Sequence, residues 1–536
     1  MKQIGFKNFR RFSNFPAMEL SPITILVGEN NAGKSTVVKG ILALSDFLKW
    51  RDDFAVLMEK TNGRPNKKHK NAVVEYIKNQ KFYFNTSYLA HIGTFKRALY
   101  NKADESVIQF YTKLGFQDIT IEVTGDRNDE ESVNGVISKV IVEYKEIGFK
   151  AEFDLQNDKS VITFSPVKPL EEDLSFIPSK SRTDAKDFLS SLSDMHSYSY
   201  DISDYFRRFS PDLINALTAT VEIAISASME FDRTNKYIGS ELINKLKPID
   251  NLKEEDISFF KEYTKKICFS SRVESWIFRL PETRMVMLRG MSNIEYLYAH
   301  AVTQTVIYSA KDTNDYLSRT IHEFASLPKT ENDYRREFIT QWMSEFNIGE
   351  DYVITSVGGE AHIVKIKNKD GELVNLADKG MGSIQLMVLL FRLAITLPKR
   401  PLTEDDHKRQ MILRSRIPRI IIIEEPEQNL HPMLQSKLAD LLYDIYENYG
   451  YRFIIETHSE YLIRKTQVIV GEKYKNKSAE EFEKDNPFKV YYFPQSGIPY
   501  DMEYSNKGGF KQKFGDGFFN EASRLNSSVI KNKLEE

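Results

Sequence analysis

Apolar residues near the start of the chain change from the period of a strand to the period of a helix. Pro22 is followed by Ile23 to Val27, a β-rich apolar run that predicts a short buried strand ending at Gly28. From Ser35 onward the apolar positions recur mostly three, four and seven residues apart, which predicts a helix. These positions are Val37, Val38, Ile41, Leu42, Leu44 and Leu48. The residues between the two elements therefore form a strand-to-helix loop.

Two more strands, with a helix between them, are predicted near the other end of the chain. The strands are Arg419 to Ile423 and Tyr451 to Ile455. The first ends at Glu424-Glu425 and the second at Glu456-Thr457-His458-Ser459. Between them, leucines at helical spacing run from Pro432, which favours a helix start, to Gly450, which favours a helix end. We expect the polar residues to meet, because parallel sheets form their ligand crevices where strands end.

The middle of the chain has a β-rich part followed by a mainly helical part. Short β-like runs separated by polar turns predict an antiparallel meander over residues 118–165. Residues 183–345 show a mostly helical pattern, clearest at 188–209 and 316–346, with prolines as breaks. A sustained heptad pattern is missing, so we do not expect a long coiled-coil arm.

Composition and charge limit the class of protein. The 536 residues include 41% hydrophobic and 28% charged residues, which is typical of a globular protein and unlike a disordered one. The net charge of -2 gives no overall field that would attract nucleic acid, so any such contact must be local. The basic run Arg64 to Lys70 is either a DNA-facing loop or an ordinary solvated loop.

The lack of a recognisable targeting signal and the single cysteine predict a cytoplasmic protein. The single cysteine, Cys268, excludes an intramolecular disulfide framework and a cysteine-based zinc site. Met1 to Phe12 lacks the apolar segment of a secretory signal. The longest apolar stretch, Ile384 to Leu397, is 14 residues long and contains polar residues, so it is too short to span a membrane.

The predicted strand-to-helix loop matches the G-x-x-x-x-G-K-[ST] pattern of a phosphate-binding loop. Its glycines let the backbone wrap phosphate oxygens, Lys34 supplies charge to the β- and γ-phosphates, and the Ser35 hydroxyl can ligate Mg²⁺. The expected ATP-binding residues are Gly28, Glu29, Asn30, Asn31, Ala32, Gly33, Lys34, Ser35 and Thr36.

Three side chains at the ends of the C-terminal strands complete the predicted site. We expect Glu424 to hold Mg²⁺ together with Ser35, and Glu425 to orient or deprotonate the attacking water. We expect His458 to sense the γ-phosphate, although a histidine alone at a strand end is more often structural. Lys34, Glu425 and His458 are thus the predicted catalytic residues.

These motifs resemble the ABC-type ATPases of the SMC/RecF class, and most closely the OLD-like (overcoming lysogenisation defect) bacterial AAA-type ATPases. The resemblance rests on Phe6 to Phe12, the Gly28 to Ser35 loop (Walker A), Glu424 to Glu427 (Walker B) with Leu430-His431-Pro432, and Thr457 to Glu460. Glu424 stands where many relatives have Asp. Its carboxylate is also a hard oxygen ligand, so we expect Mg²⁺ binding to survive this difference.

The resemblance implies a signature segment that caps the ATP of an opposite subunit. Residues 379–385 fit the L-S-x-G-x-x-Q spacing, although Lys379 and Gly380 replace the usual Leu and Ser. Backbone at Gly380 and Gly382 could approach a phosphate, and Ser383 and the amides after it could present donors at a helix start. Gly380, Gly382, Ser383 and Gln385 are therefore predicted ATP-binding residues. For the Q-loop residue, Gln80 and the Gly93 to Phe95 segment are both candidates.

The resemblance also implies the fold. We expect an α/β protein, an ABC-type P-loop ATPase head with a mixed sheet and flanking helices, and with an inserted, mainly helical region. Residues 1–180 would form the N-terminal half with Walker A and a β-rich lobe. Residues 181–345 would be the insertion, and residues 346–536 the C-terminal half with the signature, Walker B, the switch histidine and a short tail.

The implied function is an ATPase that uses ATP and Mg²⁺ as sensor, switch or scaffold of a bacterial antiphage defence system. Two heads of the same chain would close on ATP as a dimer or higher oligomer and control a separate effector, such as a nuclease or toxin, with DNA or a phage protein as trigger. OLD proteins carry their own nuclease with a D-x-D pair, and residues after His458 contain no such pair.

Other functions fit less well. The main alternative is a RecF/SMC-like DNA-repair ATPase that acts directly on DNA, which salt-dependent DNA binding would reveal. A membrane-transporter subunit would have a signature nearer L-S-G-G-Q and no insertion of this size. A scaffold that turns ATP over slowly remains open.

Overall fold

A computed structural model describes most of the N-terminal and C-terminal parts of the chain. The described residues are 3–60, 81–84, 91–114, 117–144, 149–154, 156, 159–164, 198–201, 294–297, 304–309, 311, 315–328, 333–398, 420–515 and 518–535. The chain divides into two units. The first comprises Met1–Glu19, Thr36–Ser292 and Arg414–Ile417, and the second comprises Leu20–Ser35, Asn293–Leu413 and Pro418–Glu536.

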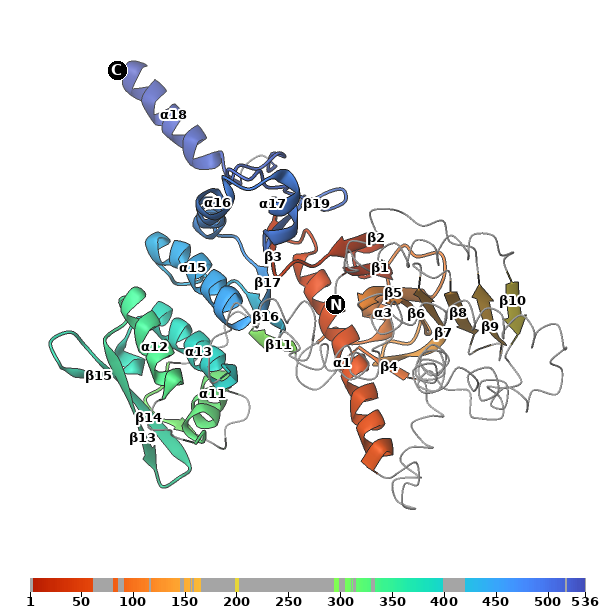
Figure 1. Ribbon diagram of the computed structural model, residues 1–536, viewed down its shortest axis with the longest axis horizontal. Coiled ribbons are helices and arrows are strands. Elements are labelled where there is room, and N and C mark those ends of the chain that lie inside the picture. The colour runs from red at the N-terminus through yellow and green to blue at the C-terminus, as the bar shows by residue number, and fades with distance from the viewer. Residues whose placement is uncertain are drawn as a thin grey trace, which may run out of the picture. The chain divides into compact units, whose positions relative to one another are not determined.

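The first unit contains a nine-stranded sheet in the order β10-β9-β8-β7-β6-β5-β1-β2, with β4 paired to β7 (Figure 1). The strands are β1 (Gln3–Phe9), β2 (Phe12–Glu19), β4 (Lys81–Tyr83), β5 (Val107–Leu114), β6 (Gln117–Thr124), β7 (Asn134–Tyr144), β8 (Phe149–Asp154), β9 (Lys159–Phe164) and β10 (Tyr198–Asp201). Neighbours from β6 to β9 pair antiparallel, which confirms the predicted meander.

The predicted helical region contains strands as well as helices. β10 is a strand inside the stretch 188–209 that we predicted to be helical, and it pairs with β9. Its Tyr-Ser-Tyr-Asp sequence alternates with the period of a strand, which the helical reading overlooked. The prediction over 316–346 is confirmed as α11 (Tyr316–Ala325) and α12 (Tyr334–Glu345). The rest of residues 188–209 and the basic run at 64–70 lie outside the described residues.

The second unit contains a six-stranded sheet in the order β11-β16-β17-β3-β18-β19. The strands are β3 (Ile23–Gly28), β11 (Ile294–Leu297), β16 (Ile420–Glu424), β17 (Arg452–Glu456), β18 (Phe488–Phe493) and β19 (Tyr500–Asp501). Every neighbouring pair is parallel except β18 and β19. The apolar runs that predicted β3, β16 and β17 are therefore adjacent strands of one parallel sheet, with their carboxyl ends at one edge.

Helices of the second unit begin and end at the residues that favour such ends. α15 (Pro432–Tyr449) starts with proline and ends at Gly450, whose φ of 70° is the left-handed conformation that glycine adopts readily. α16 (Glu460–Tyr474) is capped by Ser459, whose hydroxyl accepts the Leu462 amide. The remaining helices are α13 (Met381–Thr396), α17 (Ala479–Asp485) and α18 (Glu521–Glu535).

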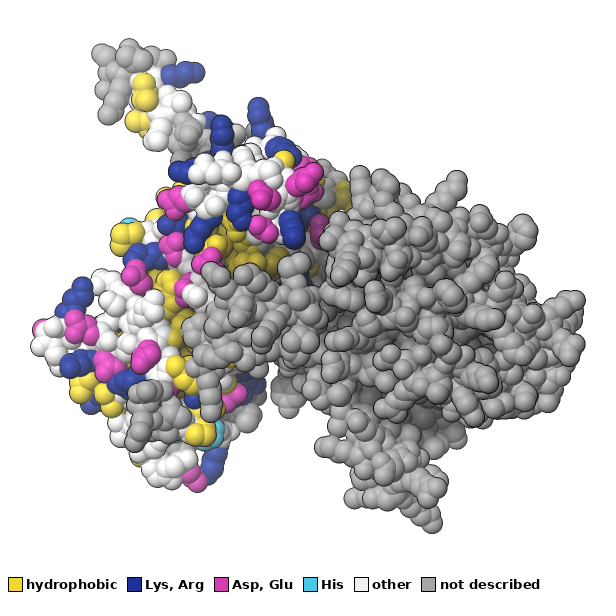
Figure 2. Space-filling model, viewed as in Figure 1, with side chains coloured by type: hydrophobic (Ala, Val, Ile, Leu, Met, Phe, Trp, Pro, Cys, Tyr) yellow, Lys and Arg dark blue, Asp and Glu magenta, His cyan; other side chains and the backbone are white. Residues whose placement is uncertain are grey.

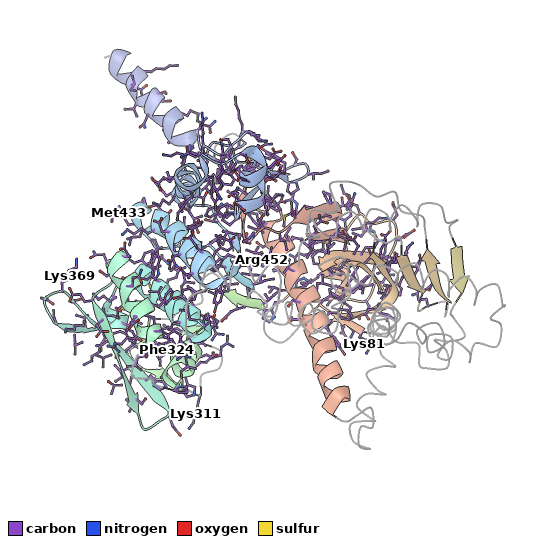
Figure 3. All side chains as sticks on the ribbon, viewed as in Figure 1. Lys81, Lys311, Phe324, Lys369, Met433 and Arg452 are labelled. Atoms are coloured by element: carbon purple, nitrogen blue, oxygen red, sulfur yellow. The ribbon has the colours of Figure 1, made fainter. Side chains whose placement is uncertain are left out.

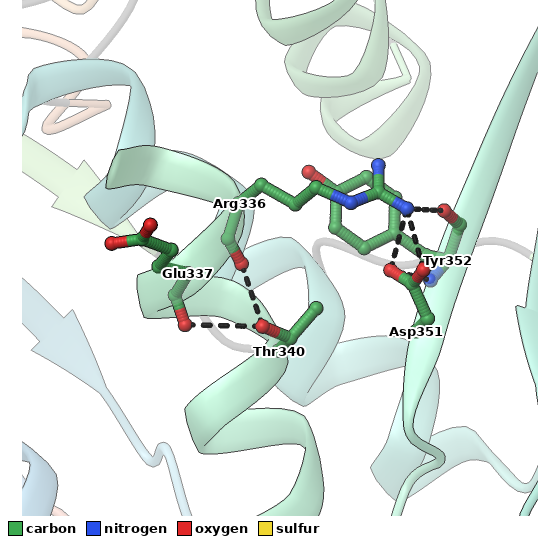
Figure 4. A network of polar contacts seen from close by, with 5 residues as sticks. All are labelled: Arg336, Glu337, Thr340, Asp351 and Tyr352. Atoms are coloured by element: carbon green, nitrogen blue, oxygen red, sulfur yellow. Dashed lines mark hydrogen bonds and ion pairs between the residues drawn. The ribbon is translucent and has the colours of Figure 1, made fainter. Parts of the chain in front are cut away.

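A second, four-stranded sheet packs with α11, α12 and α13. It consists of β12 (Tyr308–Ser309), β13 (Asp351–Val357), β14 (Ala361–Lys367) and β15 (Leu373–Asn375). Arg336 fastens α12 to β13, because its guanidinium donates to Asp351 at 2.6 Å and to the Tyr352 carbonyl at 3.1 Å (Figure 4). The same guanidinium carbon lies 4.9 Å from the centre of the Tyr352 ring.

The described surface mixes charges of both signs. On the face drawn in Figure 2, lysines and arginines alternate with acidic side chains over the second unit. Figure 3 labels Met433 at the start of α15, where its side chain is 61% exposed, and Arg452 on β17. Among the described helices, none is both long and apolar enough to cross a membrane.

Candidate functional site

The loop after β3 is shaped by glycines that no larger residue could replace. Gly28 has a φ of 140°, and a Cβ at this position would lie 2.2 Å from the Phe493 carbonyl oxygen on β18. Asn31 and Gly33 also have positive φ values, 58° and 107°. The loop therefore curls at the carboxyl end of β3 before α1 (Lys34–Lys60) begins, which is the geometry of a phosphate-binding loop.

The Lys34 side chain contacts the backbone of the loop. The Lys34 ammonium donates to the carbonyls of Gly28 at 3.0 Å and Glu29 at 2.9 Å, so the side chain folds back over the loop. Ala32, Gly33, Lys34 and Thr36 are buried, whereas Glu29, Asn30, Asn31 and Ser35 are exposed. Burial lowers the pKa of Lys34, although the charges of Glu456, Glu425 and Glu427 oppose the shift.

The ends of β16 and β17 bring carboxylates to the same edge of the sheet. Glu424 and Glu456 are register partners on the two parallel strands, and the Glu425 amide donates to the Glu456 carbonyl at 2.7 Å. The Ser35 hydroxyl, predicted to act with Glu424, donates to Glu456 Oε1 at 2.8 Å. The structure thus adds a third carboxylate to the two predicted ones.

Glu456 is the most buried of these three carboxylates. Its exposed fraction is 6%, and its second oxygen, Oε2, is buried without a hydrogen-bond partner among the described residues. Burial, with smaller effects of the charges of Glu424 and Glu425, raises the pKa of Glu456 to about 7, while the Ser35 hydrogen bond and Lys34 oppose the shift. The Ser35 hydroxyl therefore contacts a buried carboxyl group that lies close to two others.

Glu425 adopts an uncommon backbone conformation directly after β16. Its φ is 43°, in the left-handed region that residues other than glycine seldom occupy. Gln428 donates from its side-chain amide to Glu425 Oε2, and His458 Nε2 lies 3.8 Å from Glu425 Oε1. The structure therefore brings the two predicted catalytic residues together.

His458 follows β17, the strand beside the one that carries the carboxylate pair. Burial lowers the pKa of His458, and Lys34 lowers it further, while Glu425 opposes the shift. The His458 amide donates to Glu427 Oε1 at 2.7 Å. Glu427 is buried, so it fixes the backbone of His458 relative to the Glu425 loop. A largely neutral imidazole in this position can donate to or accept from a phosphate oxygen.

The predicted signature segment has contacts within its own chain. A Cβ on Gly382 would lie 2.5 Å from the Asn429 carbonyl oxygen, whereas nothing lies within 4 Å of a Cβ on Gly380. The Ser383 amide donates to the Gly380 carbonyl at 2.8 Å, so this amide is used within the helix, and the role of Ser383 toward a nucleotide stays a prediction. The helix starts two residues earlier than expected, which places that amide inside its first turn.

Two other signature side chains also bind their own unit. The Lys379 ammonium donates to the Ile348 carbonyl at 3.0 Å and to Asn368 Oδ1 at 2.6 Å. Gln385 lies at the Glu425 loop, with Nε2 at 3.5 Å from the Glu425 carbonyl and Oε1 at 3.4 Å from Asn429 Nδ2. Gly380 is therefore the predicted signature residue with open space around it.

The two Q-loop candidates fare differently. Gln80 lies outside the described residues. In the first unit, Thr94 caps α3 (Phe95–Ala98) by accepting the Arg97 amide, and Phe95 is fully buried. These contacts give the Gly93 to Phe95 segment a structural role.

Sequence reasoning missed Glu456, Glu427 and Gln428 as parts of this site. Glu456 had a usable signal, because it ends an apolar strand just as Glu424 does. Glu427 was noticed as part of the Walker B motif without a role, and Gln428 had no signal, since their roles depend on how the loop after β16 turns back on itself.

A hollow of about 890 Å³ lies elsewhere in the second unit, beside the Arg336 network. Its lining includes Arg335, Glu337 and Lys367, and none of the predicted site residues. Among the described residues, no group of three or more His, Cys, Asp or Glu side chains could hold a metal ion by itself. A Mg²⁺ site at a phosphate-binding loop needs fewer, because Ser35 and the nucleotide phosphates supply other ligands.

The fold and the loop define the class: an α/β protein with a P-loop nucleotide-binding fold. The model of the AAA ATPase domain family matches residues 1–463, so the chain belongs to this family and is an ATPase. No curated protein matches the chain.

Solved SMC head domains match the chain loosely. The Pyrococcus furiosus Smc head domain with an extended coiled coil, bound to the C-terminal domain of ScpA, is 11% identical, with 99% of each chain covered and a TM-score of 0.28. The head from Pyrococcus yayanosii, with a coiled coil and joint, is 10% identical, with 95% of this chain and 97% of that one covered and a TM-score of 0.31. The Thermotoga maritima head is 10% identical, with 94% and 98% covered and a TM-score of 0.30.

Proposed function

We propose that the protein is an ATP-driven switch in which two heads close on ATP and open after hydrolysis. The observation that carries this proposal is the meeting of Lys34, Ser35, Glu425 and His458 at the carboxyl ends of β3, β16 and β17. Open space around Gly380 supports a second head as the partner, because a helix N-terminus can approach a phosphate there.

Each residue of the site has a separate task in hydrolysis. Lys34 and the loop amides neutralise charge on the β- and γ-phosphates, and Glu425 orients the attacking water or accepts its proton. His458 contacts the γ-phosphate, and Gln428 holds Glu425 in position. Ser35 and Glu424 would hold Mg²⁺, and the buried unpaired oxygen beside them fits a cation. When bound, Mg²⁺ offsets phosphate charge.

The switch would serve an antiphage defence system by controlling a separate effector, such as a nuclease or toxin. This part rests on the resemblance of the Glu424 to Glu427 and Thr457 to Glu460 motifs to the OLD-like ATPases. Direct action on DNA, as in a repair ATPase, is the alternative, with the mixed charge of the described residues on the face drawn in Figure 2 weighing against it.

Glu425→Gln tests the switch. It keeps the side-chain size and the Gln428 contact but removes the charge, so hydrolysis should fall by about 10²- to 10⁴-fold while ATP still binds. Light scattering with and without Mg-ATP should show a dimer that persists in Glu425→Gln and dissociates in the wild type as ATP is consumed.

Glu483→Gln is the matched control, because Glu483 is an exposed carboxylate on α17. It should behave as the wild type in both assays. Equal turnover in Glu425→Gln and the wild type would remove Glu425 from the reaction. A mass that does not respond to ATP in any variant would reject the switch, and salt-dependent DNA binding would favour the repair ATPase.

A further inference from the structure

Glu456 has no assigned task in the mechanism above, although it makes the hydrogen bond to Ser35. The Ser35 hydroxyl donates to Glu456 Oε1 at 2.8 Å, across 421 residues of sequence. Of the three carboxylates at this edge of the sheet, Glu456 is the one that contacts the predicted metal-binding hydroxyl in this way. Its other oxygen is buried and has no hydrogen-bond partner among the described residues.

An unpaired buried carboxylate oxygen is costly unless something compensates it. A structural carboxylate would normally have both oxygens satisfied by donors. Here the charges of Glu424 and Glu425 also bear on Glu456, while Lys34 is the cation that acts on it. Acidic side chains thus lie close to Glu456, and a divalent cation is suited to bind among carboxylate oxygens.

We propose that Glu456 is a Mg²⁺-site residue, which shares the ion with Ser35 and Glu424 when nucleotide is bound. This inference rests on the proposed function, because it assigns a further residue to the same site. The register of β16 and β17 places Glu424 and Glu456 side by side, and Ser35 lies within hydrogen-bond distance of Glu456. Hard oxygen donors from three elements, β16, β17 and α1, thus converge on one place.

Glu456→Gln distinguishes a metal-site residue from a structural one. Its amide oxygen can still accept the Ser35 hydrogen bond, so a purely structural role would survive the substitution. The charge is lost, so a role at the ion would not survive. The experiment titrates Mn²⁺ into the full chain with a non-hydrolysable ATP analogue and follows free Mn²⁺ by electron paramagnetic resonance, without hydrolysis.

We expect Glu456→Gln to weaken Mn²⁺ binding about 10- to 100-fold, while metal-free binding of the analogue stays within about twofold of the wild type. Glu483→Gln is again the control and should bind Mn²⁺ as the wild type does. Glu456→Asp keeps the charge but is one methylene shorter, so its Mn²⁺ affinity should lie between those of Glu456→Gln and the wild type. It also tests the proposal if Glu456→Gln fails to fold.

Three outcomes are informative. Unchanged Mn²⁺ affinity in folded Glu456→Gln, with tight binding in the wild type, would overturn the assignment of Glu456 and leave the proposed function standing. Absence of nucleotide-dependent Mn²⁺ binding in the wild type would overturn both. In a double substitution with Ser35→Ala, losses that are smaller than additive would support one shared ion.

Discussion

Gly28 shows how a single residue can fix the geometry of the whole site. Its positive φ turns the chain out of β3, and its missing side chain lets the Phe493 carbonyl approach. The Glu29 amide donates to the same carbonyl at 3.1 Å, so the start of the loop is fastened to β18. Loop shape therefore depends on a strand that lies more than four hundred residues further along the chain.

Gly28→Ala should remove nucleotide binding and lower stability by at least about 2 kcal/mol, because the Cβ meets backbone that cannot move away and the conformation is strained. Gly509→Ala is the control, since its Cβ would make an ordinary 3.4 Å contact with Ser505 Oγ. Melting temperature and binding of a fluorescent ATP analogue would check this. Normal nucleotide binding by Gly28→Ala would contradict the reading of the loop.

At the scale of elements, α13 is joined to the loop after β16. Gly382 packs against the Asn429 carbonyl, and Gln385 lies at the Glu425 carbonyl. The signature helix therefore contacts the loop that carries the proposed water-orienting residue. A shift of the start of α13 would therefore act on the Glu425 loop through these direct contacts.

A pair of alanine substitutions separates the two glycines at the start of α13. Gly382→Ala should destabilise the protein by about 1–3 kcal/mol, because its Cβ would overlap the Asn429 carbonyl. Gly380→Ala should leave the melting temperature unchanged, because its Cβ meets open space, and should weaken ATP-dependent dimerisation. Equal stability of the two variants would show that Gly382 is not held against Asn429.

The elements of the site were predictable where one residue type decides the outcome. Pro432 marks the start of α15 and Gly450 marks its end, and four consecutive isoleucines mark β16. Outside the site, β10 was not predicted, because its short aromatic alternation lies among residues with helical spacing. Glu456 was not recognised either, since its contact with Ser35 follows from the strand order β16-β17-β3, which no local pattern encodes.

For the whole molecule, buried titratable groups give stability a pH dependence of two opposite signs. Burial lowers the pKa of His362, with a smaller effect of His322, so the neutral form stabilises the fold above about pH 6.5 and this contribution is lost on acidification. Glu456, with a pKa raised to about 7, acts in the other direction, because its contribution is present in acid and lost as the pH rises from about 4.5 through 7.

His362→Gln isolates the histidine contribution. His362 Nε2 lies 3.0 Å from His322 Nδ1, and its Nδ1 lies 3.2 Å from the Ser356 hydroxyl, so the variant loses contacts as well as the titrating ring. We expect the wild type to melt higher than His362→Gln at pH 7.5, and this difference to shrink at pH 5.5. A difference that stays constant with pH would show that His362 does not titrate in this range.

The position of β3 in its sheet also has a consequence for the synthesis of the chain. β3 leaves the ribosome first among the strands of this sheet, yet its two neighbours, β17 and β18, lie more than four hundred residues further along the chain. Until Phe493 has been added, the phosphate-binding loop lacks the carbonyl that its first turn contacts. A nascent chain should therefore be unable to bind ATP until β18 has been synthesised.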